Sequence, residues 1–373
     1  MSSLFDALPL RDLTFRNRIF VSPMCQYSSE DGFATDWHLV HLGSRAVGGA
    51  ALVLTEATAV TAEGRISPED LGIWKDEHVE PLSRIVRFIH AQGAHAGMQL
   101  AHAGRKGSTW RPWAGRPGSV PEAEGGWTAV APSAVAFEGY ATPAALDDAG
   151  IGRVIQAFAD GARRAREAGF RVIELHAAHG YLVHQFLSPL SNRRDDRYGG
   201  SFENRTRLAR EVVEAVRREW PERLPLLLRV SATDWVEGGW DVEQSVELAK
   251  LVGPLGVDLV DCSSGGLVAG AKIPVGPGYH VPFAERIRRE GGVPTAAVGM
   301  ITDPAQAEQI VSTGQADAVV MARELLRDPY WPLFAARALD RPATWPAQYL
   351  RAAPAGAKAR EPAAEPGRKE EAA

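Results

Sequence analysis

Eight short apolar runs alternate with longer amphipathic stretches along the chain, and this alternation limits the possible folds more than any other feature. Most of the runs are continuously apolar, which is typical of parallel strands that are buried on both faces. They predict strands at Ile19–Val21, Ala51–Thr55, His95–Leu100, Val172–Leu175, Leu226–Val230, Val257–Cys262, Thr295–Val298 and Ala318–Met321. The stretches between them predict helices, including Glu77–Ala91, Ile151–Ala168, Asn204–Glu219, Val242–Leu251 and Pro304–Ser312, with Ser201 as an N-cap.

Eight strand–helix units in one unbroken series favour a single-domain α/β protein, a (β/α)8 TIM barrel. The alternative is an open doubly wound sheet, which usually carries a Gly-x-Gly-x-x-Gly turn after its first strand. No such turn follows Ile19–Val21. We therefore expect residues 1–351 to form one barrel, because α/β barrels commonly reach this length as one domain.

Two segments do not fit the strand–helix pattern. Residues 107–128 follow the third predicted strand, are rich in Gly and Pro, and contain Trp110, Trp113 and Trp127. This position predicts a lid-like insertion at the catalytic face, although a surface insertion with its tryptophans packed on the barrel fits equally well. Residues 352–373 contain mainly Ala, Pro, Glu, Lys and Arg and predict a disordered tail.

The net charge of −5 is modest, so it indicates neither nucleic acid nor a membrane surface as a partner. No apolar run is long enough to cross a bilayer. The first residues mix charged and apolar types rather than forming the apolar core of a signal peptide. With only two cysteines, Cys25 and Cys262, we expect a reducing, cytoplasmic location.

Function in such a barrel lies at the carboxyl ends of the strands. The first strand is followed by Ser22-Pro23-Met24-Cys25-Gln26-Tyr27, where Pro23 sharpens the turn and leaves neighbouring backbone groups free for a ligand. A lone cysteine is more often a small core residue than a catalyst, but Cys25 lies at a strand end beside Tyr27. The third strand ends near Gln99, whose amide can donate and accept hydrogen bonds, as the imide edge of a flavin requires.

The fourth strand is followed by two histidines and a tyrosine, His176, His179 and Tyr181. The two imidazoles can ligate a metal, but no carboxylate or cysteine ligand stands at the usual spacing beside them. They can instead stabilise negative charge on a substrate oxygen, with Tyr181 as a nearby proton donor. A purely structural pair of histidines is the third interpretation.

The later strand ends contain features that suit an anionic cofactor. Arg229 would place a positive charge in the barrel mouth, which is costly without an anionic partner such as reduced flavin. The last two strands end at Gly299-Met300 and Ala322-Arg323, and the loops after these strands form the usual phosphate site of barrels.

Taken together, these strand ends resemble the Old Yellow Enzyme family of FMN ene-reductases, in particular its thermophilic-type subclass of bacterial NADPH dehydrogenases. The resemblance covers roughly Leu4 to Arg351. The motifs that carry it are Ser22-Pro23-Met24-Cys25-x-Tyr27, Gln99-Leu-Ala-His-Ala-Gly-Arg-Lys106, His176-Ala-Ala-His-Gly-Tyr181, Tyr198-Gly-Gly-Ser-x-x-Asn-Arg205 and Arg323-Glu-Leu-Leu-Arg-Asp-Pro329.

The resemblance implies a role for each matching residue. The isoalloxazine ring of FMN would be held by Ser22, Pro23, Met24, Cys25, Ala57, Gln99 and Arg229, and its phosphate by Gly299, Met300, Ala322 and Arg323. His176 and His179 would bind the carbonyl or nitro oxygen of the substrate, Tyr181 would protonate the carbon next to that group, and Tyr27 would line the pocket. Cys25 would also tune the flavin.

The resemblance also implies the reaction and the assembly. NADPH, or alternatively NADH, would reduce the flavin, and an activated C=C bond would then take the hydride at the same site in ping-pong order. Arg351 would reach the active site of a neighbouring subunit in a homodimer or homotetramer with composite sites. Two alternatives stay open from the sequence: a metal-dependent barrel hydrolase or lyase that uses His176 and His179, and a non-catalytic flavin redox sensor based on Cys25.

Overall fold

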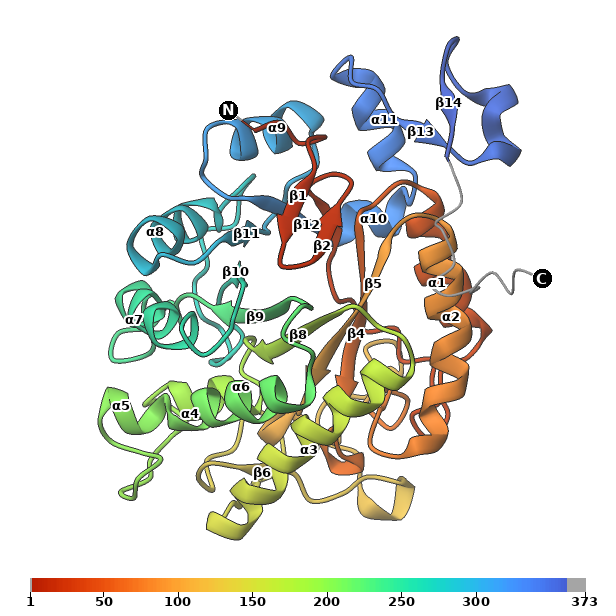
Figure 1. The fold of residues 1–373 in the computed structure, drawn as a ribbon. Coiled ribbons are helices and arrows are strands. Elements are labelled where there is room, and N and C mark those ends of the chain that lie inside the picture. The colour runs from red at the N-terminus through yellow and green to blue at the C-terminus, as the bar shows by residue number, and fades with distance from the viewer. Residues whose placement is uncertain (1, 361–373) are drawn as a thin grey trace, which may run out of the picture.

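Eight parallel strands close into a barrel in the computed structural model, which describes residues 2–360 (Figure 1). The barrel closes where β12 pairs with β3, with Val319 opposite Ile19. An open sheet would leave these two strands as edges, so the predicted barrel is confirmed and the open sheet is wrong. The barrel strands are β3 (Ile19–Val21), β4 (Leu52–Ala59), β5 (His95–Ala101), β8 (Val172–Ala177), β9 (Leu226–Ser231), β10 (Leu259–Ser263), β11 (Thr295–Ala297) and β12 (Ala318–Met321).

Helices surround the barrel and pack on the outer face of the strands (Figure 1). Several of them begin where an acidic or hydroxyl side chain caps the first turn: Asp147 accepts from the amide of Gly150, and the predicted cap Ser201 accepts from that of Asn204. The predicted helix 204–219 is divided into two at Thr206. The helices are α1 (Asp36–Val47), α2 (Val79–Ala91), α3 (Asp148–Glu167), α4 (Leu182–Leu187), α5 (Phe202–Arg205), α6 (Arg207–Glu219), α7 (Val242–Val252), α8 (Val281–Gly291), α9 (Pro304–Ser312), α10 (Arg323–Arg327) and α11 (Trp331–Ala338).

An N-terminal hairpin, which the sequence did not predict, covers the amino ends of the barrel strands. It consists of β1 (Leu8–Leu10) and β2 (Leu13–Phe15). His95 Nε2, at the start of β5, lies 3.1 Å from the carbonyl oxygen of Thr14, and Arg11 forms an ion pair of 2.6 Å with Asp258 just before β10. The carboxyl ends of the strands therefore remain as the end where a ligand can enter the barrel.

The C-terminal segment folds back on the barrel through β13 (Thr344–Trp345), the 3₁₀ helix η5 (Ala347–Ala352) and β14 (Lys358–Ala359), which pairs with β13. The guanidinium of Arg360 donates to the carbonyl oxygens of Ala46, Val47 and Gln92, near the ends of α1 and α2. These bonds provide hydrogen-bond donors for carbonyl groups that have no partner within the helices at their carboxyl ends. Residues 352–360, predicted as the start of a disordered tail, thus have hydrogen-bonded structure, and residues 361–373 lie outside the described part of the chain.

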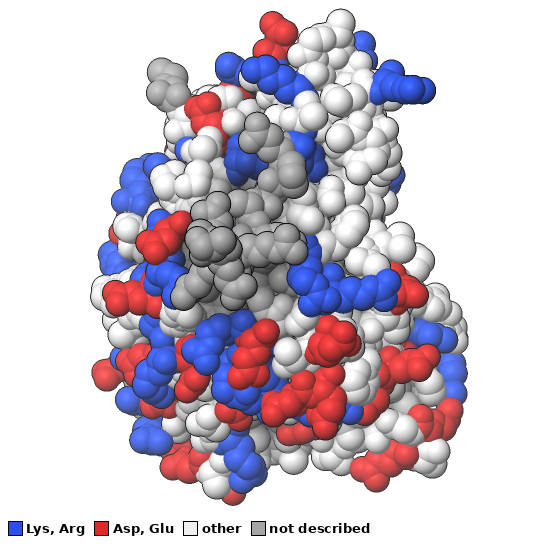
Figure 2. Space-filling view, turned by 45° about the vertical axis from the view of Figure 1, so that its right-hand side comes forward, with Lys and Arg blue, Asp and Glu red and all other residues white. Residues whose placement is uncertain are grey.

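Acidic and basic side chains are interleaved over the face shown in Figure 2, and much of the projecting C-terminal segment carries no charge there. Many of the surface charges are paired, as Asp76 is with Arg163 and Arg164. Among residues 2–360, no helix combines the length and the apolar character needed to cross a membrane.

Candidate active site

The residues predicted from the strand ends gather at the carboxyl end of the barrel. Three of them have backbone angles in the left-handed region, with φ of 48° at Tyr27, 58° at His179 and 51° at Met300. Such angles are uncommon for residues other than glycine and concentrate at functional sites. The turns after β3, β8 and β11 therefore hold strained conformations around one opening.

His176 and His179 lie side by side, with ring centroids 5.1 Å apart, and the ring of Tyr181 lies 5.0 Å from that of His176. The backbone N–H of Ala178 donates to His176 Nδ1, so the ring proton of neutral His176 is on Nε2. His179 Nε2 lies 2.7 Å from Ser263 Oγ, and a hydroxyl that donates there leaves the proton of His179 on Nδ1. Burial and the charge of Arg229 lower the pKa of both imidazoles well below 6.5, so both are neutral hydrogen-bond donors.

Lys106 stabilises the turn that contains His179 and Tyr181 through hydrogen bonds to the backbone. Its ammonium donates to the carbonyl oxygens of His179 at 2.9 Å and Gly266 at 3.0 Å, and lies 5.0 Å from the ring centroid of Tyr181. A Cβ at Gly180 would lie 2.3 Å from the carbonyl oxygen of Gly266, so only glycine allows this close approach. Burial, followed by the charge of Arg105, lowers the pKa of Lys106 to about 8.

Replacing Lys106 with methionine is expected to lower the free energy of unfolding by about 1–3 kcal/mol, because two carbonyl oxygens lose their donor. The same change should weaken the binding of phenols, since the His179 turn loses its anchor. Urea unfolding and a phenol titration measure both effects. Lys250→Met is the matched control, because Lys250 forms an exposed ion pair with Glu247 on α7 and should change stability by at most about 1 kcal/mol. Equal effects of the two substitutions would contradict the role of Lys106.

Cys25, Tyr27 and Tyr181 pack on a small apolar cluster of Ala57, Ile66, Ala101 and Ala103. Burial raises the pKa of the Cys25 thiol well above its usual value, so the sulfur stays protonated. A redox-sensing cysteine needs a stabilised thiolate, whereas Cys25 is a half-buried, protonated thiol, so its environment does not support the sensor alternative. Burial also raises the pKa of Tyr181 well above 10, so its hydroxyl keeps its proton and can donate it.

A glutamine and an arginine reach the interior below these aromatic side chains. Gln99 lies opposite Ala57 on β4 and donates from Nε2 to Glu174 Oε1 at 2.7 Å. Arg229, on β9, donates to Ser22 Oγ at 3.0 Å. Ser22 directly follows β3, and β3 and β9 are not neighbours in the barrel, so this bond crosses the interior. Arg229 Nε lies 3.2 Å from Asp261 Oδ2. Arg229 therefore has an anionic partner within the protein, Asp261, which the sequence did not predict.

Glu174 and Asp261, which are fully buried, were not among the predicted site residues. The sequence does contain an indication of both residues, because each is an acidic residue within an otherwise apolar strand. The two strand sequences are Val-Ile-Glu-Leu and Leu-Val-Asp-Cys. Buried carboxylates are rare unless they are paired.

A cavity of about 220 Å³ extends from Ser263 past the ends of β11 and β12, where Gly299, Met300, Ala322 and Arg323 line it. A Cβ at Gly299 would lie 3.0 Å from the His280 ring, so glycine keeps this wall open. Ala322 leaves the first turn of α10 without a side-chain cap, and Arg323 adds a cation. Uncapped backbone N–H groups and a guanidinium suit a phosphate, and the neighbouring interior offers Gln99 and Arg229 to a polar ring, so the residues fit FMN.

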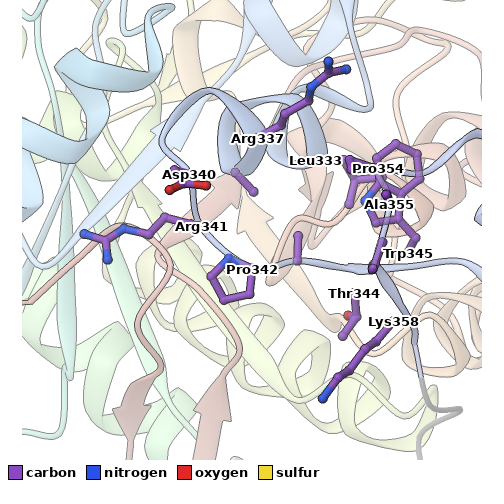
Figure 3. A pocket seen from close by; sticks show the side chains of 14 residues that line it. Leu333, Arg337, Asp340, Arg341, Pro342, Thr344, Trp345, Pro354, Ala355 and Lys358 are labelled. Atoms are coloured by element: carbon purple, nitrogen blue, oxygen red, sulfur yellow. The ribbon is translucent and has the colours of Figure 1, made fainter.

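A larger cavity, of about 530 Å³, lies away from the barrel mouth, between α11 and the C-terminal segment (Figure 3). Leu333, Pro354 and Ala355 lie together on one side of it, whereas the guanidinium of Arg337 points away. None of the residues predicted for the active site lines this cavity, so its size does not make it the candidate active site. Arg351 lies in the exposed helix η5 and does not join the barrel-mouth residues of its own chain.

Within residues 2–360, no group of three or more His, Cys, Asp and Glu side chains is placed to hold a metal ion. Cys25 and Cys262 are free thiols.

Comparison with known proteins identifies the family. The model of the NADH:flavin oxidoreductase / NADH oxidase family, which uses FMN, matches residues 3–341. The chain is 50% identical over 351 residues to an NADPH dehydrogenase of Geobacillus thermodenitrificans, covering 93% of this chain and 98% of the relative. It is 49% identical over 355 residues to an NADPH dehydrogenase of Listeria innocua, covering 94% and 99%.

Solved structures agree with this assignment. The Old Yellow Enzyme homologue of Zymomonas mobilis has a TM-score of 0.75 at 27% identity, covering 92% of this chain and 94% of that chain. A 2-naphthoyl-CoA reductase has a TM-score of 0.83 at 26% identity, but this chain spans only 52% of it. These matches confirm the predicted family and the FMN cofactor, and they favour neither alternative function. The chain belongs to the NADH:flavin oxidoreductase / NADH oxidase family, as an FMN-dependent oxidoreductase of the Old Yellow Enzyme type.

Proposed function

We propose that this chain is an ene-reductase, which reduces the activated C=C bond of α,β-unsaturated carbonyl or nitro compounds in ping-pong order. NADPH is the hydride donor, in line with the names of the bacterial relatives, and NADH is the alternative donor. FMN, held by residues such as Gln99, Arg229 and Arg323, would supply the hydride-transfer chemistry that links the nicotinamide to the substrate. The observation that carries the proposal is the pair of neutral imidazoles beside a protonated tyrosine at the barrel mouth.

His176 and His179 bind the substrate oxygen through their ring N–H groups. Negative charge grows on that oxygen during reduction, and donors fixed in advance stabilise it most where water is excluded. The nearby charges of Arg229 and Lys106 act in the same direction. Tyr181 donates a proton to the carbon next to the carbonyl or nitro group, while Tyr27 and Cys25 line the pocket.

The cofactor is proposed to lie between the two regions that suit its two ends. Ser22, Pro23, Met24, Cys25, Ala57, Gln99 and Arg229 hold the ring, and Gly299, Met300, Ala322 and Arg323 hold the phosphate. Residues 107–128 form a lid over the pocket, supported by the edge-to-face contact of Trp113 with Tyr27 at 5.6 Å between ring centroids.

An anaerobic titration of the purified protein tests the function. NADPH is expected to bleach the FMN spectrum, and an enone, a maleimide or a nitroalkene is expected to restore it. Release of a chromophore other than FMN on denaturation, or bleaching that no alkene reverses, would refute the proposed function.

Tyr181→Phe is expected to leave the reduction of FMN by NADPH unchanged and to slow the half-reaction with enones about a hundredfold, the usual contribution of a general acid. The reason is that the tyrosine proton is needed only when the substrate carbon is protonated. Stopped-flow spectroscopy measures each half-reaction separately. If both slow equally, Tyr181 positions the ligands and does not donate the proton.

We further propose a homo-oligomer, a dimer or a tetramer, in which Arg351 completes the active site of a neighbouring subunit. Support comes from the exposed large apolar side chains that precede it in η5, Tyr349 and Leu350, because exposed apolar patches mark interaction surfaces. Arg351 itself lies on the exposed helix η5, where a neighbouring chain can reach it.

Mixing Arg351→Ala subunits with His176→Ala subunits is expected to restore part of the activity that each variant lacks alone. Some mixed interfaces contain a site with its own His176 and an Arg351 from the neighbour. Activity is measured after subunit exchange, and mixing each variant with itself is the control. A monomer on a sizing column, or mixtures no more active than the mean of their parents, contradicts the composite site.

A further inference from the structure

A row of polar side chains crosses four adjacent barrel strands below the proposed ring site. Gln99 is on β5, Glu174 on β8, Arg229 on β9 and Asp261 on β10. Gln99 lies opposite Glu174, and Arg229 lies opposite Asp261. The row therefore pairs each of the two side chains proposed to meet the cofactor, Gln99 and Arg229, with a carboxyl group on the next strand, Glu174 and Asp261.

The charges in this row do not balance when all three ionisable groups are charged. Arg229 supplies one positive charge, and Glu174 and Asp261 would supply two negative charges, all in a buried interior. Gln99 satisfies Glu174 Oε1, but Glu174 Oε2 and both carboxylate oxygens of Asp261 have no hydrogen-bond partner among the described residues. A proton on one carboxyl group restores neutrality, and two buried carboxylates that share one cation commonly keep one proton.

We propose that Glu174 keeps a proton at neutral pH and is a positioning residue for FMN: it orients the amide of Gln99, and its ionisation in alkaline solution makes bound FMN harder to reduce. Of the two carboxyl groups, Asp261 is the ionised one, because it forms an ion pair with Arg229. Glu174 forms no ion pair with Arg229. The inference rests on the proposed contact of Gln99 with the flavin ring.

The surroundings of Glu174 agree with this assignment. The charged groups that reach it are Asp261 from β10 and Arg229 from β9, and β5 adds the uncharged amide of Gln99. Burial, then the charge of Asp261, raise the pKa of Glu174 to about 8, against the opposing effects of Arg229 and Gln99. The carboxyl group thus loses its proton above the neutral range. A new negative charge beside the ring disfavours the addition of electrons, so the reduction potential falls there.

The midpoint potential of bound FMN, measured against pH by spectroelectrochemistry, tests the proposal. The wild type and Glu174→Gln should have equal midpoint potentials below the pKa of Glu174. Glutamine, like the protonated acid, is uncharged, and its side-chain oxygen can still accept the hydrogen bond from Gln99. Above that pKa the wild-type potential should fall below that of the variant. In the alkaline range the mediator supplies two electrons, and the solvent supplies one proton to the flavin ring and a second proton that Glu174 regains. An infrared difference spectrum of reduction should then show a protonated carboxyl band that Glu174→Gln lacks.

Asp261→Asn provides a second variant with a different expected result. Removing the negative charge of Asp261 favours the ionised form of Glu174. The bend in the plot of midpoint potential against pH, which marks the ionisation of Glu174, should therefore move to lower pH. Lys106 also has a pKa of about 8, but a bend caused by Lys106 persists in Glu174→Gln. A bend that survives in Glu174→Gln, or potentials of wild type and variant that stay parallel at every pH, overturns the inference. A wild-type protein that does not bind FMN would instead overturn the proposed function.

Discussion

Replacing His176 or His179 with alanine is expected to slow enone reduction on the order of a hundredfold or more, the usual cost of one lost oxyanion donor, while FMN stays bound. Both rings are neutral. The backbone contact of His176 leaves its Nε2–H free for a ligand, and His179 keeps a free Nδ1–H when the Ser263 hydroxyl donates to its Nε2. Alanine removes the donor, from a buried position at His176 and from a half-buried one at His179.

Phenols offer a direct measurement for the histidine variants, because a phenolate oxygen resembles the charged oxygen of the reacting substrate. The long-wavelength absorption band of the phenol complex should weaken in both alanine variants. Asparagine at either position keeps one N–H donor and should retain more binding than alanine. Because the pKa of each ring lies well below 6.5, neither imidazole should change its charge, and so alter phenol affinity, at higher pH. Normal phenol spectra in both alanine variants would disprove the assignment.

Arg229→Met is expected to lower the free energy of unfolding by about 3–5 kcal/mol, the usual cost of breaking a buried ion pair from one side. The substitution leaves the carboxylate of Asp261 buried, without hydrogen bonds among the described residues and without its cation. Ser22 also loses the donor that reaches it across the barrel. Urea unfolding of the FMN-free protein measures the change, and FMN titration should show weaker binding.

The double variant Arg229→Met, Asp261→Asn separates the buried charge from the lost packing. It removes both charges, so it should recover much of the lost stability but none of the lost FMN affinity. Arg163→Met is the matched surface control, because Arg163 pairs with the largely exposed Asp76, and it should cost at most about 1 kcal/mol. A double variant as unstable as Arg229→Met would show that the ion pair is not the source of the effect.

The sequence predicted the elements whose signals are local. The boundaries of β3, β12 and α9 agree with the prediction, because short apolar runs and the Asp303-Pro304 start of a helix are defined by neighbouring residues. The turn motifs around His176 and Gln99 also led to the family, since each lies within a few consecutive residues. The extension of β4 to Ala59 was not predicted, because a bulge between Leu54 and Ala57 depends on pairing with β5.

Only the tertiary structure decided which side chains meet. Gln99 and Glu174 are 75 residues apart in the chain, and Arg229 and Ser22 are 207 apart, so their contacts depend on strand register and barrel closure. The same holds for Lys106, whose bonds to His179 and Gly266 join the turns after β8 and β10. The sequence alone therefore determined the fold class, the family and most of the candidate ligand-binding residues. The charge balance behind those residues and the tautomer of His176 were set by packing, because both depend on atoms that only the closed barrel brings within hydrogen-bonding distance.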